Sequence, residues 1–403
     1  MTLTTTANPI DLLGMTLAEY AAALGKHPQA MRKQYSALMR EGIGAVLPSL
    51  SRREDSGEVV KFCLPIGASG GKTLETESVI IPMVSYRGTQ WYTLCISSQV
   101  GCRMGCTFCE TARMGLLRNL TAGEIVQQRL VARQIREEGV RHGVPVETAE
   151  PLRPLSPPSE DHEEEKNVED KTLRDAGARG AALGKSWAAR GPRYFVDGIQ
   201  NIVFMGMGEP LDNFENTVQS IRVFNEPAGL DFPHTQITVS TVGRIDGIRK
   251  LAALKWPNLR LAISLNAAED RLRDELMPIN KGMPLEELQR ALVEYPLPKK
   301  GRFLVEYVLI KGVNDSLADA AAVARWCRPL RCTVNLIPYN PQRGASYETP
   351  SDETIMAFLL HLRDQGVFVK RRVTRGRDLM GACGQLGNPA VKRGKGRILN
   401  AEC

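Results

Sequence analysis

From about residue 79 onward, short apolar and β-branched runs alternate with longer stretches in which apolar residues recur at helical spacing. The short runs predict strands at residues 92–96, 201–205, 236–240, 259–264, 303–310, 332–337 and 367–373. The longer stretches predict helices at residues 121–139, 214–224, 269–276, 284–294, 315–327 and 352–364. Because strands and helices that alternate along a chain form βαβ units, we expect a parallel sheet with right-handed crossovers. The predicted fold class is α/β, with a partial or complete (β/α) barrel.

The beginning of the chain has a different pattern and predicts a small helical accessory domain over residues 1–50. Thr16 and Glu19 have the spacing of a capping box, in which each side chain bonds to the backbone of the other residue. Pro28 suits the first turn of a further helix, and Gly42 suits the end of that helix. We therefore expect helices here and the strands of the core further along.

Residues 143–193 interrupt the alternation, because proline, charged and small residues dominate and apolar residues do not recur with any period. We interpret this segment as a low-complexity insertion within the core, and favour a tolerated loop over an arm that contacts RNA or protein. Residues 147–175 hold ten acidic and four basic side chains, a local charge of −6, whereas the whole chain has a net charge of +7. The remainder therefore carries +13, which suits a polyanion such as RNA.

The composition is that of an ordinary globular protein, with 43% hydrophobic and 24% charged residues in a chain of 403. No apolar run reaches the ~18 residues that a membrane helix needs. The N-terminus also lacks the basic and then apolar character of a secretory signal, so we expect a cytoplasmic protein with no membrane contact. In that compartment the nine cysteines indicate metal binding or thiol chemistry rather than a disulfide framework.

Three cysteines form a C-x3-C-x2-C motif just after the first predicted core strand of the alternating region. The thiolates of Cys102, Cys106 and Cys109 can converge on one centre, and three ligands leave one iron of a [4Fe–4S] cluster open. A structural zinc ion is the alternative, although zinc normally takes four ligands. Cys95 could be the fourth, but it lies on a strand, and no second C-x2-C or histidine pair follows. Inert buried cysteines are a further alternative, which the glycines beside the ligands disfavour. The spacing and the strand-then-helix context favour the iron–sulfur interpretation.

With Phe108 before its last cysteine, the motif resembles that of the radical S-adenosylmethionine (SAM) superfamily. Other segments narrow the resemblance to the RlmN/Cfr family of RNA adenosine methyltransferases. They are residues 76–82, 95–109, 115–125, 201–213, 239–244, 261–267, 277–281, 306–315, 335–341 and 374–386. The resemblance implies a partial barrel of the radical SAM type over residues 75–390, ending in a C-terminal methyl-carrying loop.

The resemblance also implies which loops bind SAM. In a β/α barrel the carboxyl ends of the strands form the functional rim, so loops that follow the predicted strands should converge on the cysteine motif. By resemblance, Gly208 allows the backbone to approach SAM, and Glu209 holds the ammonium group of SAM. The other implied SAM contacts are Ser240, Ser264, Leu265, Asn266 and Asn335. Family members commonly have histidine where this chain has Asn266, which keeps one donor and one acceptor.

Three further residues have catalytic roles by resemblance: Cys383 carries the methyl group, Cys95 resolves the covalent intermediate, and Glu77 accepts a proton. Taken alone, a glutamate before a strand is usually solvated surface. A lone cysteine is usually a small buried hydrophobic residue, which is our interpretation of Cys63, Cys327, Cys332 and Cys403. For Cys383, the basic neighbours Arg375 and Arg377 can favour the thiolate.

These roles imply methylation of carbon 2 of an adenosine in 23S rRNA through a methyl-cysteine intermediate. The implied cofactors are a [4Fe–4S] cluster and SAM. The implied partners are RNA and a reducing electron donor such as flavodoxin or ferredoxin, which also reduces a transient disulfide. The basic segments 369–377 and 391–397 can contact RNA phosphates or can be solvated surface. The alternatives are tRNA as substrate, carbon 8 as target, and a non-catalytic, zinc-stabilised RNA-binding protein.

Overall fold

The computed structural model of the chain describes residues 9–69, 71–85, 88–141, 197–342, 344, 346–388 and 390–391. The chain divides into two units, Met1–Ala132 with Ile199–Cys403, and Arg133–Gly198. The sheet and the site belong to the first unit. The predicted insertion at 143–193 lies outside the described residues, as does the basic segment from residue 392 onward. No helix in the ranges given above combines the length and the apolar character required to cross a membrane.

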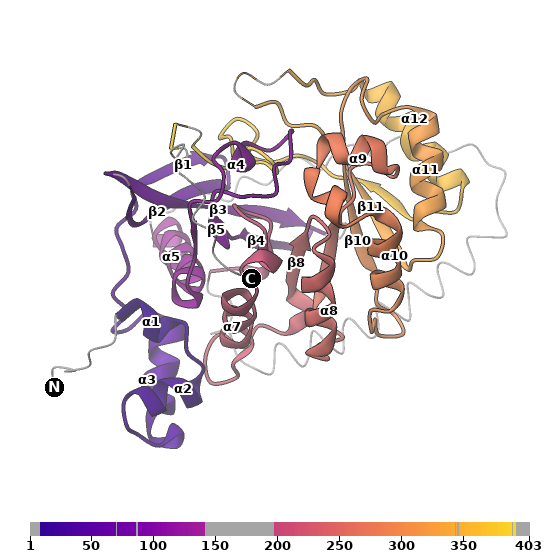
Figure 1. The fold of residues 1–403 in the computed structure, drawn as a ribbon. Helices are drawn as coiled ribbons and strands as arrows, with labels where there is room; N and C mark the ends of the chain where they lie inside the picture. Colours follow the sequence, from indigo (N-terminus) through magenta and orange to yellow (C-terminus); the bar gives the residue numbers. More distant parts are fainter. Residues whose placement is uncertain are drawn as a thin grey trace. The chain divides into compact units, whose positions relative to one another are not determined.

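Ten strands of the described chain form one mixed sheet, in the order β1-β2-β3-β4-β7-β8-β9-β10-β11-β12 (Figure 1). The first part is antiparallel and consists of β1 (Arg52–Ser56), β2 (Val59–Ser69), β3 (Lys72–Val84) and β4 (Gln90–Cys95). The second part continues from β4 with parallel strands: β7 (Ile199–Phe204), β8 (Ile237–Thr241), β9 (Arg260–Ser264), β10 (Phe303–Leu309), β11 (Cys332–Pro338) and β12 (Val369–Arg371). The predicted strands are β4 and these parallel strands, so the α/β class with a partial barrel is confirmed.

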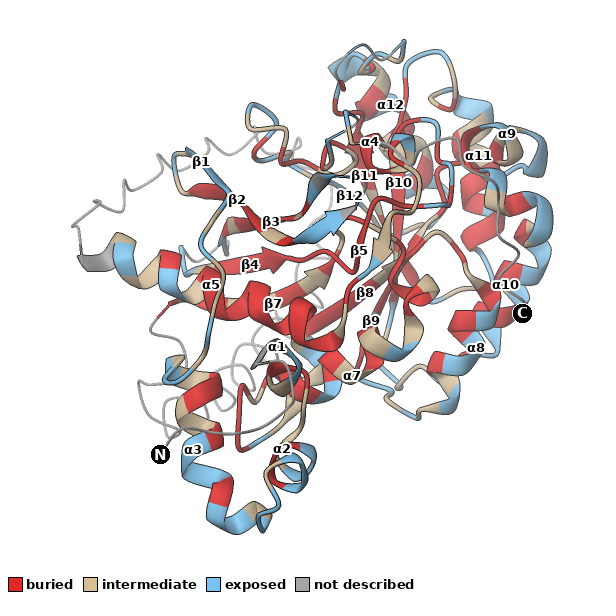
Figure 2. Cartoon of the chain, turned by 60° about the vertical axis from the view of Figure 1, so that its left-hand side comes forward, coloured by how far each residue is buried: buried red, intermediate tan, exposed pale blue. Residues whose placement is uncertain are grey.

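The parallel strands read as apolar runs because they are covered on both faces. Ile202 on β7, Val239 on β8, Ile263 on β9, Val305 on β10 and Val334 on β11 are all inaccessible to solvent. Figure 2 shows buried residues concentrated along these central strands. The hydrophobic pattern therefore identifies each of them in the sequence.

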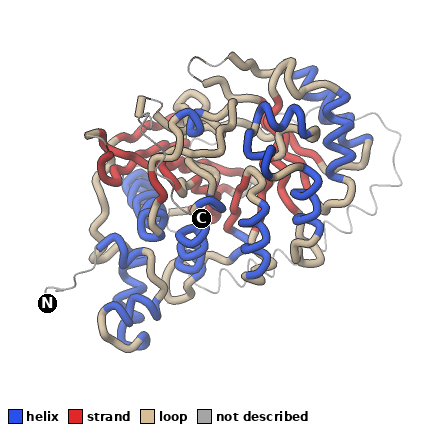
Figure 3. Tube along the Cα trace, in the orientation of Figure 1, coloured by secondary structure: helices blue, strands red, loops and turns tan. Residues whose placement is uncertain are grey.

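Helices follow the strands and line one side of them (Figure 3). The predicted helices are α5 (Ala122–Arg141), α7 (Phe214–Asn225), α9 (Asp270–Leu276), α10 (Leu285–Val293), α11 (Leu317–Cys327) and α12 (Asp352–Asp364). The pattern does not predict α8 (Ile245–Ala253), because Gly247 stands in its middle and glycine disfavours helix. A side chain at Gly247 would meet Leu211 Cβ at 2.6 Å, so glycine lets this helix approach the turn after β7.

The N-terminal helices are α1 (Pro9–Leu13), α2 (Leu17–Ala23) and α3 (Pro28–Glu41). The predicted capping box at Thr16 opens α2, and Gly42, with φ 70°, ends α3. Tyr35 of α3 is fully buried and donates its hydroxyl to Met15 O at 2.8 Å. Arg40 Nη2 donates to Pro227 O at 2.7 Å, which ties α3 to the turn after α7.

The sequence pattern does not predict β1–β3, because β1 has no apolar residue, and charged residues (Lys61 on β2, Glu75 and Glu77 on β3) interrupt the apolar positions of the other two strands. The register pairs Lys61 on β2 with Val79 on β3, and Val79 with Cys95 on β4. Cys63 on β2 lies opposite Glu77 on β3. Directly opposite residues share a face of a sheet, and so do residues two apart on one strand. These five residues therefore define one face, which we call the β2–β4 face.

The C-terminal loop, residues 374–388, packs on the β2–β4 face. A side chain at Gly381 would meet Val79 Cγ2 at 3.6 Å and Lys61 Cδ at 3.8 Å. A side chain at Gly376 would meet Val59 Cγ1 at 3.0 Å. The loop that holds Cys383 therefore lies against the antiparallel strands, far from it in sequence.

Candidate active site

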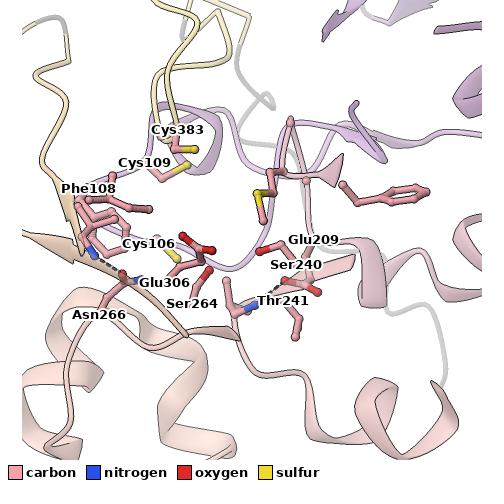
Figure 4. Close-up of a pocket in the computed structure, with 18 of the residues that line it drawn as sticks. Cys106, Phe108, Cys109, Glu209, Ser240, Thr241, Ser264, Asn266, Glu306 and Cys383 are labelled. Carbon is pink, nitrogen blue, oxygen red and sulfur yellow. Dashed lines mark hydrogen bonds between the residues drawn. The ribbon is translucent and has the colours of Figure 1, made fainter. Parts of the chain in front are cut away.

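A cavity opens at the carboxyl ends of the parallel strands (Figure 4). The predicted site residues that line it are Cys106, Cys109, Gly208, Glu209, Ser240, Ser264, Asn266 and Cys383. The predicted site residues outside its lining are Glu77, Cys95, Cys102, Leu265 and Asn335. Figure 4 shows Cys109 and Cys383 on one side of the cavity, with Glu209 and Ser240 on the other. The loops that follow several different strands thus meet at one rim, as the barrel topology predicts.

The motif cysteines lie on a loop that backbone hydrogen bonds hold in place. Cys102 N donates to Gly115 O at 3.1 Å, and Thr107 N donates to Leu276 O at 3.0 Å. Gly101 has φ 73°, and a side chain there would collide with the Gly115 carbonyl oxygen. Glycine therefore allows the motif to begin close to the small hairpin of β5 (Gln99–Val100) and β6 (Arg118–Asn119).

The motif thiols are poor anions in this environment. Burial raises the pKa of Cys102, Cys106 and Cys109, and Cys109 adds to the increase at the other two. A cationic metal centre would reverse this balance, because it stabilises thiolate ligands. Three thiols on one loop fit a [4Fe–4S] cluster that keeps one iron open. Within the part of the chain that the structure describes, no group of three or more His, Cys, Asp or Glu side chains could hold a metal ion.

The turn after β7 brings a buried carboxylate to the cavity. Gly208 has φ 97°, and a side chain there would meet Gln99 Cβ at 2.5 Å. Gln99 Oε1 accepts from Glu209 N at 2.8 Å, and the Glu209 carboxylate accepts from Leu211 N at 3.0 Å and Val242 N at 2.9 Å. Burial raises the pKa of Glu209 to about 7, although these backbone bonds lower it. An ammonium group beside Glu209 would favour its ionised form.

The ends of β8 and β9 contribute polar groups. Ser240 and Ser264 line the cavity, and Asn266 follows with φ 57°. Asn266 Oδ1 accepts from Val308 N at 2.9 Å, while its Nδ2 donates to Met277 Sδ at 3.2 Å. The Asn266 amide is thus engaged with the protein on both sides while it lines the cavity.

Leu265 and Asn335 do not line the cavity, but both bond to Glu306, which does line it. Leu265 N donates to Glu306 O at 2.9 Å, and Asn335 Nδ2 donates to Glu306 Oε1 at 2.8 Å. Burial raises the pKa of Glu306, against the effects of Arg372 and Asn335. Sequence analysis missed Glu306 because it lies inside an apolar strand run.

Arg273 of α9 is a further residue that the sequence analysis missed, since an arginine on a helix usually reads as surface. Its side chain is buried, and it donates to the carbonyl oxygens of Val242 (2.6 Å), Leu265 (3.0 Å) and Ser264 (3.2 Å). It therefore joins the loops after β8 and β9. Burial lowers the pKa of Arg273 to about 10, within the charged range at neutral pH.

Cys383 stands at the cavity on the C-terminal loop, which is tied to the cysteine loop. Glu110 N donates to Gly384 O at 2.8 Å, and Gln342 Nε2 donates to the same oxygen at 3.0 Å. Asn340 Nδ2 donates to Cys383 O at 3.2 Å. These bonds hold the Cys383 segment beside the cysteine motif.

The guanidinium that acts on Cys383 is that of Arg372, whereas the predicted neighbours Arg375 and Arg377 are exposed on the loop. Cys383 raises the pKa of Arg372 well above its ordinary value, against the effect of burial, and Glu306 adds to the increase. Arg372 Nη1 lies 3.9 Å from Glu306 Oε2. A cation does act on Cys383, as predicted, but it is Arg372, which directly follows β12, and not Arg375 or Arg377.

Cys95 and Glu77 lie on the β2–β4 face, under the C-terminal loop. Burial raises the pKa of Cys95 to about 12, and Cys383 adds to the increase, which places the two thiols within electrostatic reach. Glu77 is only 3% exposed, unlike the solvated surface residue that its sequence context suggests. All cysteines in the described ranges are free thiols, and Cys63, Cys327 and Cys332 are buried as predicted.

A second cavity adjoins the first, because Arg372 lines both. Its lining also includes Arg371, Arg377 and Thr374, together with one acidic residue, Asp352. Arg371 Nη2 pairs with Asp352 Oδ1 at 2.6 Å. These arginines belong to the predicted basic segment 369–377, while the other basic segment lies outside the described residues except for its first position.

Comparison with known proteins gives sequence and fold similarity over most of the chain. No protein-family model matches it. The dual-specificity RNA methyltransferase RlmN of Xanthobacter autotrophicus is 39% identical over 384 residues, which are 95% of this chain and 80% of that protein. The RlmN of Syntrophotalea carbinolica is 34% identical over 403 residues, with 94% and 89% covered. A crystal structure of a radical SAM methyltransferase from Sphaerobacter thermophilus matches with a TM-score of 0.72 and 32% identity, and 93% of this chain and 98% of that chain are covered.

Proposed function

Because the chain belongs to the RlmN family of radical SAM RNA methyltransferases, we propose that it methylates carbon 2 of an adenosine in 23S rRNA through a methyl-cysteine intermediate. One observation carries this proposal. Cys106, Cys109, Glu209 and Cys383 come from three separate segments and line one cavity. The cysteines proposed to bind the cluster, the carboxylate proposed to bind SAM and the thiol of Cys383 therefore line the same cavity.

The cofactors would be held by residues that differ in chemistry. Cys102, Cys106 and Cys109 would bind the [4Fe–4S] cluster as thiolates. Glu209 would bind the ammonium group of SAM, with the other contacts at Gly208, Ser240, Ser264, Leu265, Asn266 and Asn335. When bound, the cluster and SAM supply a methyl group and a carbon-centred radical that can remove a hydrogen atom.

Cys383 would carry the methyl carbon to the RNA. Carbon 2 of adenine lies between two ring nitrogens and is electron-poor, so it cannot attack a methyl sulfonium as a nucleophile. Cys383 sulfur is a nucleophile and would take the methyl group as a thioether, losing its thiol proton. Loss of one hydrogen atom from that S-methyl group leaves a carbon radical, which can add to an electron-poor ring.

Glu77 and Cys95 would complete the reaction. Glu77 would accept the proton that ring carbon 2 loses, and the ring radical would give up one electron to a one-electron acceptor such as an iron–sulfur cluster, so that the ring becomes aromatic again. Cys95 sulfur would then attack Cys383 sulfur, so that a disulfide forms while the bond from Cys383 sulfur to the new carbon breaks and that carbon takes up a proton. Burial raises the pKa of Cys95 to about 12 and Arg372 lowers it, so Arg372 is the described cation that opposes the effect of burial on this thiol. A donor such as flavodoxin or ferredoxin would return two electrons to the disulfide in the reducing cytoplasm.

RNA would approach over the second cavity. Arg371 and Arg377 line it next to the first cavity, with Arg372 between the two. Guanidinium groups suit RNA phosphates, and the target adenosine would be splayed out of its stack to enter the first cavity. Phosphate contacts there would hold the neighbouring nucleotides while the base reaches Cys383.

Mass spectrometry of RNA nucleosides from cells with and without the gene tests the proposal. We expect 2-methyladenosine to disappear from 23S rRNA without the gene, and to return with the wild-type gene but not with Cys383→Ala. Cys327→Ala is the matched control, because Cys327 is also a free thiol but lies outside the cavity lining. Loss of 8-methyladenosine would overturn the carbon assignment, and an unchanged nucleoside profile would overturn the proposed function.

Metal analysis of anaerobically purified protein provides an independent check. We expect about four iron and four acid-labile sulfide per chain. One zinc and no sulfide would instead support a zinc-stabilised RNA-binding protein and end the enzyme proposal.

A further inference from the structure

Lys61 lies between Glu77 and the C-terminal loop that carries Cys383. Its Nζ is 2.9 Å from Glu77 Oε2. The same Nζ donates to Met380 O at 3.1 Å and to Leu379 O at 3.4 Å. Glu77 and the segment just before Cys383, some 300 positions apart in the printed sequence, therefore share one ammonium group.

Lys61 and Glu77 are both buried, so their contacts are not those of a solvated surface ion pair. The Lys61 side chain is only 5% exposed and that of Glu77 only 3%. A buried ammonium is costly unless its charge is paired and its three N–H donors find acceptors. The carboxylate of Glu77 pairs the charge, and the two carbonyl oxygens accept hydrogen bonds from Nζ. The fold thus retains a buried cation whose described partners are the Glu77 carboxylate, as an ion pair, and the carbonyl oxygens of the loop.

A second cation fixes the other side of the same carboxylate. Arg52 Nη2 lies 3.3 Å from Glu77 Oε1 and donates to Cys63 Sγ at 3.4 Å. Arg52 is more exposed, with 41% of its side chain accessible, and it makes no contact with the loop among the interactions described above. Each oxygen of Glu77 therefore has its own cation, and Lys61 is the one that reaches the Cys383 loop.

We propose that Lys61 is a positioning residue that holds the Glu77 carboxylate in register with the Cys383 loop for proton acceptance. This inference rests on the proposed function of Glu77 and Cys383. Once the methyl carbon joins Cys383 sulfur to the ring, the proton on carbon 2 has a position set by Cys383. A base fixed to the same loop stays within reach of that proton, and misplacement by an ångström is costly. Lys61 itself is not among the residues that line the first cavity.

The test compares Lys61→Met, which keeps the length but removes the charge, with Lys61→Arg, which keeps the charge. The control is Lys250→Met, because Lys250 on α8 is a surface lysine 4.0 Å from Glu215. One readout needs no RNA: hydrogen–deuterium exchange of the peptide over residues 376–386. We expect faster exchange there in Lys61→Met, partial recovery in Lys61→Arg, and no change in the control.

The second readout separates the two halves of the reaction, with an in vitro transcribed 23S rRNA fragment as probe. We expect Lys61→Met to methylate Cys383 as the wild type does, measured by peptide mass. We expect product formation to slow by about tenfold to a hundredfold, while a covalent protein–RNA species accumulates. In a Glu77→Gln background, Lys61→Met should add less than about twofold, because both changes remove the same function. Lys61→Arg should recover part of the rate.

Several results would overturn the positioning role of Lys61. They are unchanged product formation in Lys61→Met, effects of Lys61→Met and Glu77→Gln that multiply fully, or unchanged exchange of the loop peptide. Equal loss of Cys383 methylation and of product would indicate general structural damage instead, and would also overturn it. If the wild type forms neither methyl-Cys383 nor methyladenosine, the proposed function fails, and the exchange experiment still decides whether Lys61 holds the loop.

Discussion

Mild acid should weaken SAM binding, because the carboxylate proposed to hold the SAM ammonium has a raised pKa. Burial raises the pKa of Glu209 to about 7 from an ordinary value of 4.5. The neutral form cannot pair with an ammonium group, so the apparent dissociation constant rises as the ionised fraction falls. At pH 7.5 about three quarters of Glu209 is ionised, and at pH 6 about one tenth. Binding should therefore weaken about eightfold between these two pH values.

Isothermal titration of anaerobic, cluster-loaded protein with SAM measures this effect. Weaker SAM binding at lower pH would have to come from Glu209. The SAM amino group gains its proton over the same pH range and would by itself strengthen binding on acidification. Glu209→Gln is the matched control: it keeps the shape and removes the titration, and its amide oxygen can keep one of the two hydrogen bonds from Leu211 N and Val242 N. This variant should bind SAM weakly and should not lose affinity toward pH 6. Equal affinity of the wild type at pH 7.5 and pH 6 would refute the role of Glu209.

Two further predictions follow from close contacts and from charge. Gly208→Ala should lower stability by about 1–3 kcal/mol, measured by denaturant unfolding, and should weaken SAM binding. The reason is that its new Cβ would lie 2.5 Å from Gln99 Cβ at φ 97°; Gly312→Ala, with φ 68° and open space around it, should show the smaller cost of the dihedral alone. Removal of Arg371 or Arg377 should lower the salt dependence of RNA binding by about 0.7 per residue, measured by fluorescence anisotropy with single-stranded RNA. Cys383 methylation should persist in the variants that lack Arg371 or Arg377. Arg290→Ala, on the outer helix α10, should leave the salt dependence unchanged, and an unchanged slope in the other two would exclude the second cavity as a phosphate site.

The fold was predictable where burial is uniform along an element. The parallel strands are covered on both faces, so each reads as a short apolar run. Strands β1–β3 are different, because the buried β2–β4 face includes Lys61 and Glu77, which look like surface positions. Only the pairing of these two charges makes their burial acceptable. The ion pair between Lys61 and Glu77 joins β2 to β3, and the hydrophobic pattern of the sequence does not predict it.

The site was predictable where its residues are close in sequence. The spacing of the cysteine motif predicts its proposed chemistry locally, and the resemblance supplies the roles proposed for Gly208 and Glu209. Arg372 and Lys61 act on Cys383 and Glu77, which stand elsewhere in the chain. Neighbours in sequence led to Arg375 and Arg377, which are exposed, whereas Arg372, directly after β12, is the cation that interacts with the thiol. Partners of this kind follow from tertiary packing and have no local signal.

The parallel and antiparallel parts of the sheet supply groups for two different tasks, cofactor binding and the proposed methyl relay. The loops after the parallel strands supply the groups proposed for the cluster and SAM, which any chemistry starting from these cofactors requires. The groups proposed for the methyl relay come from elsewhere: Glu77 and Lys61 from the antiparallel strands, and Cys383 from the C-terminal loop that packs on them. Cys95, on β4, lies at the junction of the antiparallel and parallel parts of the sheet. The antiparallel extension is therefore more than a cover for the sheet edge, because it links the proposed proton acceptor, through Lys61, to the loop that carries Cys383. A change that loosens the loop from β2 and β3 should spare cofactor binding and impair the release of product.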